Sequence, residues 1–170
     1  FFPEFVKGNR DINETSPLLD GLISSVSGAS AGAMAAIMLA AGVSPLTAAQ
    51  FCTTVTLQKF ADFPGIFAVF RGAKFEDIVD DFLPTSSPLE SLRLENAIIP
   101  VAVSAFDIQR LKGEVLSKGS MARAARASAT FPGLFQPVGW VDPDSGADYI
   151  FIDGGLTDVH GLNGLGLMSL

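Results

Sequence analysis

The sequence predicts an α/β fold in which helices pack on a largely parallel central sheet. Apolar runs typical of buried strands alternate with helix-like segments, and strands separated by helices normally pair in parallel. The three strand-like runs cover residues 21–27, 98–106 and 149–152. In addition, the pentapeptide Gly28-Ala29-Ser30-Ala31-Gly32 stands between the first run and a helix-like segment, which indicates a sharp strand-to-helix turn.

The first half of the chain contains three predicted helices. The first spans residues 31–41 and ends at Gly42, a common residue just after a helix. The second opens with Ser44 as its N-cap and Pro45 at its first position, and extends to about residue 57. Residues 60–70 are rich in Phe and predict a loop or short helical turns. The third helix spans 74–83, where apolar residues recur on one helix face, and Pro84 ends it.

The second half contains the remaining strands. Residues 98–106 form a continuous apolar run and predict a central strand, and residues 110–116 predict a hairpin or a continuation of that strand. Ser120 is expected to cap a helix over 121–129. A short strand over 149–152 then leads into Asp153-Gly154-Gly155. No repeat or linker interrupts the chain, so residues 1–170 predict a single domain.

Composition narrows the class of function. The chain of 170 residues is 48% hydrophobic and carries a net charge of −7, which argues against a nucleic-acid partner and against electrostatic docking on anionic lipid. A single cysteine, Cys52, excludes an internal disulfide and a cysteine-based metal cluster. A single histidine, His160, excludes a multi-histidine metal site. We therefore expect neither a metal nor a cofactor.

The pentapeptide predicts a nucleophilic serine. A serine on a sharp strand-to-helix turn projects its hydroxyl outward, and the glycines Gly28 and Gly32 let the backbone pass without steric overlap. The following helix, starting at Ala31, directs its first amide groups and its positive dipole end to the same place, where an oxyanion would develop. Ser30 is therefore the candidate nucleophile of a serine acyl hydrolase.

Two structural alternatives stand beside this interpretation. Gly28 and Gly32 also form a G-x-x-x-G pattern, and the uncharged run from Leu22 to Val43 has the length of a membrane span. Its serines, its glycines and its Ala-rich composition argue against a span, so no transmembrane segment is expected. The pentapeptide could also be a tight turn without chemistry.

The base that would activate Ser30 has two candidates in the sequence. A Ser-His-Asp triad would use His160, with Asp107 or Asp153 as the acid. Alternatively, Asp153 acts directly as the base in a Ser-Asp dyad, with Gly154 and Gly155 bending the chain beside it. An Asp-Gly-Gly sequence is also common in ordinary turns.

Taken together, three blocks of the chain resemble the patatin-like phospholipases. They are Gly28–Gly32 before a helix, Ala127–Phe135, and Asp153-Gly154-Gly155 after a strand. The resemblance implies a three-layer α/β/α fold and a catalytic dyad of Ser30 and Asp153 that cleaves acyl esters of phospholipids or other glycerolipids. It further implies that the block from Ser128 to Phe135 helps to line the site. The partner would be a lipid substrate at a membrane surface, approached by an intracellular or organelle-associated peripheral protein.

One feature of the family is not found. Its Gly-rich oxyanion loop precedes the serine, but Gly8 and Gly21 are isolated, and residues 1–7 resemble the helix that would follow such a loop. We therefore expect that the chain starts after the loop or that the protein has lost it, and that the C-terminus is also cut short. Two further hypotheses remain beside hydrolysis. The protein could be a non-catalytic structural or partner-binding subunit, or an acyltransferase.

Overall fold

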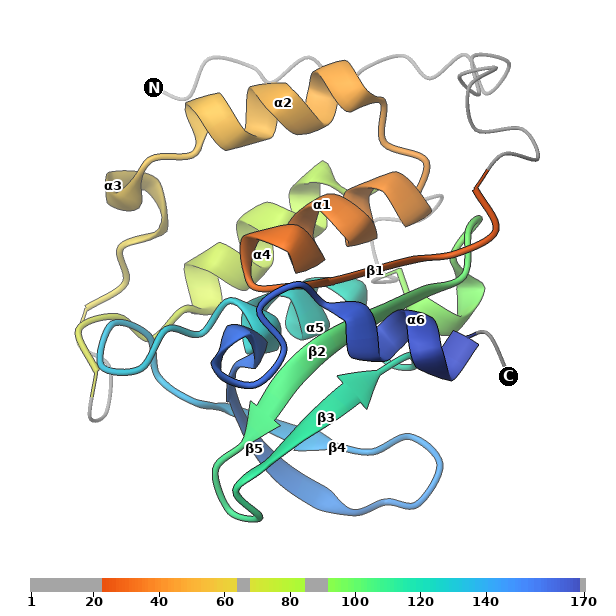
Figure 1. The fold of residues 1–170 in the computed structure, drawn as a ribbon. Coiled ribbons are helices and arrows are strands. Elements are labelled where there is room, and N and C mark those ends of the chain that lie inside the picture. The colour runs from red at the N-terminus through yellow and green to blue at the C-terminus, as the bar shows by residue number, and fades with distance from the viewer. Residues whose placement is uncertain (1–22, 64–67, 85–91, 169–170) are drawn as a thin grey trace.

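The computed structural model describes residues 23–63, 68–84 and 92–168 (Figure 1). The strands are β1 (Val26–Ala29), β2 (Val101–Asp107), β3 (Lys112–Leu116), β4 (Val138–Val141) and β5 (Asp148–Asp153). The helices are α1 (Ala31–Ala40), α2 (Pro45–Thr54), α3 (Leu57–Phe60), α4 (Ala73–Phe82), α5 (Met121–Ser128) and α6 (Leu162–Met168). Two 3₁₀ turns lie at Leu94–Asn96 and Gly154–Leu156.

The sheet is mixed, with β2 at its centre. β1 pairs with β2 in parallel, whereas β3 and β5 pair with β2, and β4 with β5, in antiparallel fashion. The predicted α/β class is confirmed, but the prediction of a largely parallel sheet is wrong for the described strands. The connections from β2 to β3 and from β4 to β5 are short turns, and such turns can join only antiparallel strands.

β1 and β5 meet head to head along one edge of β2. β3 occupies one edge of β2 from Val103 to Asp107, so both other partners must use the opposite edge. There β1 ends with Ala29 beside Ser104, and β5 arrives from the other direction and ends with Asp153 beside Ala105. The ends of two strands that are distant in sequence therefore face each other across one peptide step of β2.

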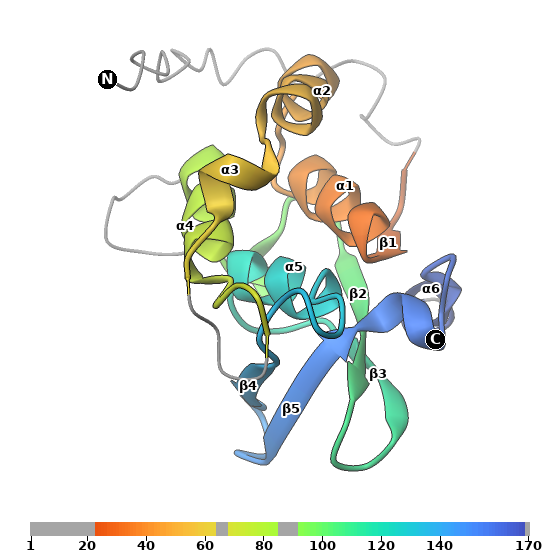
Figure 2. The ribbon, with the colours of Figure 1, turned by 90° about the vertical axis from the view of Figure 1, so that its left-hand side faces the viewer.

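Helices cover both faces of this sheet, which gives the three-layer α/β/α arrangement. Val101, Val103 and Ala105 of β2 point into the core that β2 shares with α1 and α5. On the opposite face, Gly164 of α6 packs against Ala102. Figure 2 shows α4 and α5 on one side of β2 and α6 on the other. No helix among the described residues is long and apolar enough to cross a bilayer.

Local sequence explains the helices that were predicted. Ser44 and Ser120 cap α2 and α5, because their hydroxyls accept hydrogen bonds from the backbone N–H of Thr47 and Arg123. α5 buries a stripe of alanines against the sheet, while on its other side Arg126 pairs with Glu76 of α4 at 2.8 Å. Small side chains thus allow α5 to pack closely on the sheet that carries the site.

The structure differs from the sequence-based expectation at several boundaries. β2 starts at Val101 rather than at residue 98, because Pro100 has no N–H to donate, and β1 starts opposite it at Val26. The second helix ends at Thr54 and the separate α3 follows it. β4 and α6 were not predicted. The expectation for residues 1–7, that for residues 21–22 of the first predicted strand, and part of that for residues 60–70 lie outside the described residues.

Two glycines of α6 offer a matched test of its packing. A Cβ added at Gly164 would lie 2.7 Å from Ser27 Cβ and 3.0 Å from Ala102 Cβ, whereas a Cβ at Gly166 would meet nothing within 4 Å. Because alanine favours a helix over glycine by up to about 1 kcal/mol, Gly166→Ala is expected to raise the free energy of unfolding slightly. Gly164→Ala is expected to lower it. Denaturant unfolding checks both, and equal effects would contradict this packing.

Candidate active site

The turn between β1 and α1 places a serine in a strained conformation. Ser30 has φ 53° and ψ −124°, a region that residues other than glycine rarely occupy and that costs on the order of 1–3 kcal/mol. Gly28 makes the turn sterically possible, because a Cβ there would overlap the carbonyl of Gly32 and lie 2.7 Å from the nitrogen of Ala33. The surroundings of the turn must therefore hold Ser30 in place.

The hydroxyl of Ser30 points to a carboxylate rather than to its own helix. Although Ser30 is the N-cap of α1, its side chain makes no capping hydrogen bond. Instead, its Oγ donates to Oδ2 of Asp153 at 2.8 Å. Ala31 and Gly32, the first two residues of the helix, are exposed, and their backbone N–H groups have no acceptor among the described residues.

Asp153, at the end of β5, is held by its backbone and by its other oxygen. Its N–H donates to the carbonyl of Thr130 at 2.9 Å, and its Oδ1 accepts from the N–H of Gly155 at 2.7 Å. The residue as a whole is 7% exposed. Within the part of the chain that the structure describes, no Lys or Arg pairs with this carboxylate. Oδ2 is thus left to the hydroxyl of Ser30.

The two glycines that follow Asp153 differ in their surroundings. Gly154 packs against the carbonyl of Ser104, where a Cβ would overlap that oxygen. A Cβ at Gly155 would lie 3.0 Å from Oδ1 of Asp153 and 3.9 Å from Cβ of Ser30. Glycine at both positions lets the chain turn sharply beside the serine without filling the space around it.

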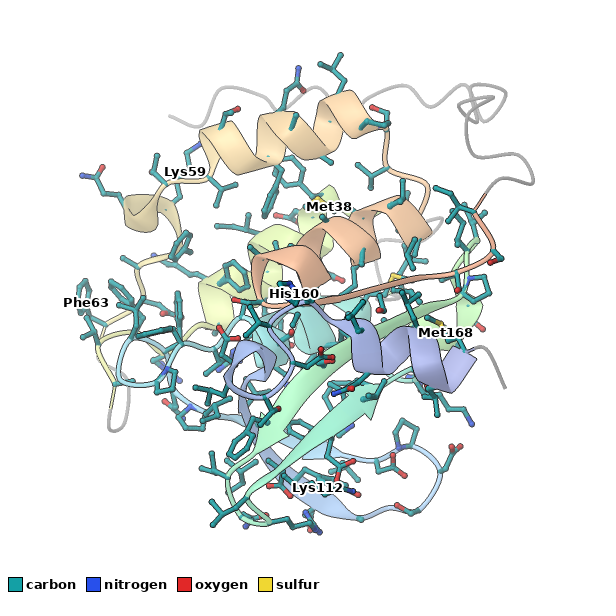
Figure 3. All side chains as sticks on the ribbon, in the orientation of Figure 1. Met38, Lys59, Phe63, Lys112, His160 and Met168 are labelled. Carbon is teal, nitrogen blue, oxygen red and sulfur yellow. The ribbon has the colours of Figure 1, made fainter. Side chains whose placement is uncertain are left out.

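Asp107 and His160, the other candidates for a triad, are not joined to Ser30. Asp107 is fully buried at the hairpin between β2 and β3, where it accepts from Arg110 at 2.7 Å and from the N–H of Gln109 at 2.9 Å. Burial raises the pKa of Asp107, but these hydrogen bonds outweigh it and hold the pKa below its usual value. His160 is exposed in the loop before α6 (Figure 3), and no hydrogen bond joins it to the described residues.

The block from Ser128 to Phe135 divides into parts with different surroundings. Ser128 is fully buried and its Oγ accepts from the N–H of Ser30 at 2.9 Å. Phe131 is 61% exposed. Phe135 instead packs among Phe60, Phe70 and Phe75, with ring centroids 5.7–5.9 Å apart. The expectation that the block lines the site therefore does not extend to Phe135, which belongs to an aromatic cluster.

Sequence reasoning missed a buried pair behind the site, Ser104 and Asp158. Ser104 Oγ donates to Oδ2 of Asp158 at 2.5 Å, and the same carboxylate accepts from the N–H groups of Leu162 and Asn163 at the start of α6. Burial raises the pKa of Asp158, but these donors together lower it below its usual value. A serine inside the apolar run 98–106 was the available signal, because a buried hydroxyl requires a partner.

Alanine substitutions at the two glycines of the pentapeptide are expected to have different effects on the stability of the protein. Gly28→Ala is expected to destabilise the protein by several kcal/mol, since the new methyl group overlaps main chain that cannot move aside. Gly32→Ala is expected to leave stability unchanged or raise it by up to about 1 kcal/mol, because its Cβ would meet nothing within 4 Å. Thermal unfolding of both variants checks this, and a stable Gly28→Ala protein would contradict the geometry.

The lowered pKa of Asp158 predicts that the stability of the protein depends on pH. This pKa is lowered in the folded protein, so the ionised group stabilises the fold above the unfolded pKa of about 4, and this contribution disappears as the pH falls through the folded value. At pH 7, Asp158→Asn is expected to lower the free energy of unfolding by on the order of 2–3 kcal/mol. Urea titrations from pH 7 to pH 3 should show this difference narrowing below about pH 4. A difference that stays constant would exclude the ionised pair.

Comparison with known proteins agrees with the three blocks of the sequence. A search of curated proteins gave no match. The family model for patatin-like phospholipases, however, matches residues 14–164, which include β1, the turn at Ser30, Ser128 and Asp153. The match covers most of the chain, and the chain therefore belongs to the patatin-like phospholipase family.

Proposed function

We propose that this protein is a lipid acyl hydrolase that cleaves fatty-acyl esters of phospholipids or other glycerolipids, with Ser30 as nucleophile and Asp153 as base. The hydrogen bond from Ser30 Oγ to Asp153 Oδ2, 2.8 Å long, is the observation that carries the proposal. A hydroxyl and a carboxylate at this separation are within the distance that proton transfer requires, which supports these two roles. Membership of the patatin-like phospholipase family supports a lipid substrate.

The proposed reaction proceeds through an acyl-enzyme. Ser30 Oγ attacks the ester carbonyl carbon while its proton passes to Oδ2 of Asp153. The tetrahedral intermediate collapses, the bond to the alcohol breaks, and the alcohol leaves with the proton from Asp153. Water then gives a proton to Asp153 as its oxygen attacks the acyl carbon. Collapse of this second intermediate releases the fatty acid, and the proton returns from Asp153 to Ser30.

The start of α1 supports the stabilisation of the negative charge in these intermediates. The N–H groups of Ala31 and Gly32 lie directly after the nucleophile and have no acceptor among the described residues. A helix N-terminus also carries a partial positive charge. In the proposed mechanism the Ala31 N–H donates to the developing oxyanion, a type of contact whose loss typically costs about a hundred- to a thousandfold in rate.

The surroundings of the pair suit an apolar substrate at a membrane surface. Four exposed apolar residues lie on the two segments that hold Asp153 in place, namely Phe131, Leu156, Val159 and Leu162, each more than half exposed. Because the chain is acidic overall, contact with a lipid surface would rest on apolar side chains such as these. We propose that these four side chains contact the acyl chains of the substrate.

A fluorophosphonate probe tests the proposal directly. In the intact protein, the probe is expected to label Ser30, and Ser30→Ala is expected to abolish both labelling and turnover of a fatty-acyl ester. Asp153→Asn keeps the shape of the side chain but removes the base, and is expected to lower the turnover number at least a hundredfold.

His160→Ala is the control that separates the two candidate bases. Since His160 has no hydrogen bond to the described residues, its replacement is expected to leave turnover within about twofold, whereas a triad would lose on the order of a thousandfold. An intact, folded protein in which Ser30 stays unlabelled would refute the proposed hydrolase and favour a non-catalytic subunit. Transfer of the acyl group to an added alcohol, with little free fatty acid, would identify an acyltransferase instead.

A further inference from the structure

Ser128 connects the candidate nucleophile to the central strand. It is the last residue of α5, and its side chain is fully buried. Its Oγ accepts from the backbone N–H of Ser30 at 2.9 Å and donates to the backbone carbonyl of Ser104 at 2.6 Å. The direction of both bonds is fixed, since a carbonyl can only accept and an N–H can only donate. One hydroxyl therefore links the turn between β1 and α1, the end of α5, and β2.

The hydrogen bond at the N–H of Ser30 bears on the direction of its side chain. Fixing the N–H fixes the plane of the peptide between Ala29 and Ser30, and from this plane the φ of 53° directs Cβ and Oγ toward Asp153. This conformation is strained and persists only where its surroundings enforce it. Among the described residues, Ser128 is the only side chain that bonds the backbone N–H of Ser30.

Ser30 and Asp153 are both positioned relative to the carbonyl of Ser104. Ala29, directly before Ser30, lies beside Ser104 in the sheet, and Asp153 lies beside the next residue, Ala105. Gly154 packs on the same Ser104 carbonyl that accepts the Ser128 hydroxyl. The hydrogen bond from Ser128 to this oxygen therefore ties the position of Ser30 to the same peptide unit that the Asp153 turn packs against.

We propose that Ser128 is a positioning residue, whose buried hydroxyl holds the Ser30 turn at the Ser104 carbonyl in the geometry required for attack by Ser30 Oγ. Ser128 makes no contact with the substrate in this role, and acts through the backbone of Ser30. The inference rests on the proposed function, because it concerns the rate at which Ser30 reacts.

The test compares two hydroxyls of the same helix. Ser128→Ala removes both hydrogen bonds at the C-terminal end of α5, whereas Ser120→Ala removes the cap at the opposite end and costs about 1 kcal/mol of stability. In the intact protein, Ser128→Ala is expected to lower the second-order rate constant for fluorophosphonate labelling about ten- to hundredfold. The turnover number for a fatty-acyl ester falls equally, with KM within about twofold. Ser120→Ala is expected to retain the wild-type rates, measured below the unfolding transition.

Rescue by a second hydroxyl separates positioning from general loss of stability. Ser128→Thr retains the hydroxyl but adds a methyl group in a fully buried place, so it is expected to unfold at a lower temperature and yet react within about threefold of wild type. Ser128→Cys replaces the hydroxyl with a somewhat larger thiol, which is a poor donor and acceptor, and is expected to react slowly. If Ser128→Ala does not fold, the comparison of the Thr and Cys variants decides.

Two outcomes would overturn the inference. One is a folded Ser128→Ala protein that reacts at the wild-type rate, or, where that variant does not fold, a Ser128→Cys protein that does so. The other is a Ser128→Thr protein as slow as the variants without a working hydroxyl. Failure of the proposed function looks different, because Ser30 then stays unlabelled in the wild-type protein as well.

Discussion

The head-to-head meeting of β1 and β5 along one edge of β2 is the constraint on which the candidate site depends. β1 runs parallel to β2 and β5 runs antiparallel to it, so their last residues approach each other from opposite directions. Ser30 follows one strand end and Asp153 occupies the other, which brings two residues 123 positions apart in sequence to a separation of 2.8 Å between side-chain oxygens. A sheet with every strand parallel would not produce this meeting.

Buried polar groups behind the site help to hold the ends of β1 and β5 together. Ser104 bonds Ser128 through its carbonyl and Asp158 through its hydroxyl, and Asp158 in turn binds the first amides of α6. Each of these groups would be costly to bury alone, but together they satisfy one another, and such networks favour a single arrangement. The apolar core therefore determines that the layers pack, while the hydroxyls and the carboxylate determine the register at which the Ser30 turn and the Asp153 turn face each other.

The sequence predicted well the elements whose ends carry local signals. The helices capped by Ser44 and Ser120 begin at their predicted residues, and the pentapeptide does lie between a strand and a helix. β4 has only four residues, one of them Gly139, so its alternation was too short to predict a strand. α6 contains two glycines and is held by the distant Ser104 through Asp158. Tertiary contacts, which no local pattern contains, therefore define the elements that were missed.

The loop between Asp153 and α6 is anchored through its main chain and through the buried side chain of Asp158. Gly154 rests on β2, and Gly161, with φ 67°, packs against the Cα of Gly28 while its carbonyl accepts a hydrogen bond from Ser27. Leu156, Val159 and His160, by contrast, extend into solvent. These three exposed side chains can thus be exchanged without moving the backbone that supports the Ser30–Asp153 pair. Under the proposed function, selectivity for one lipid over another is therefore separable from the chemistry, because evolution or design can change the exposed side chains of this loop while Ser30 and Asp153 stay in place.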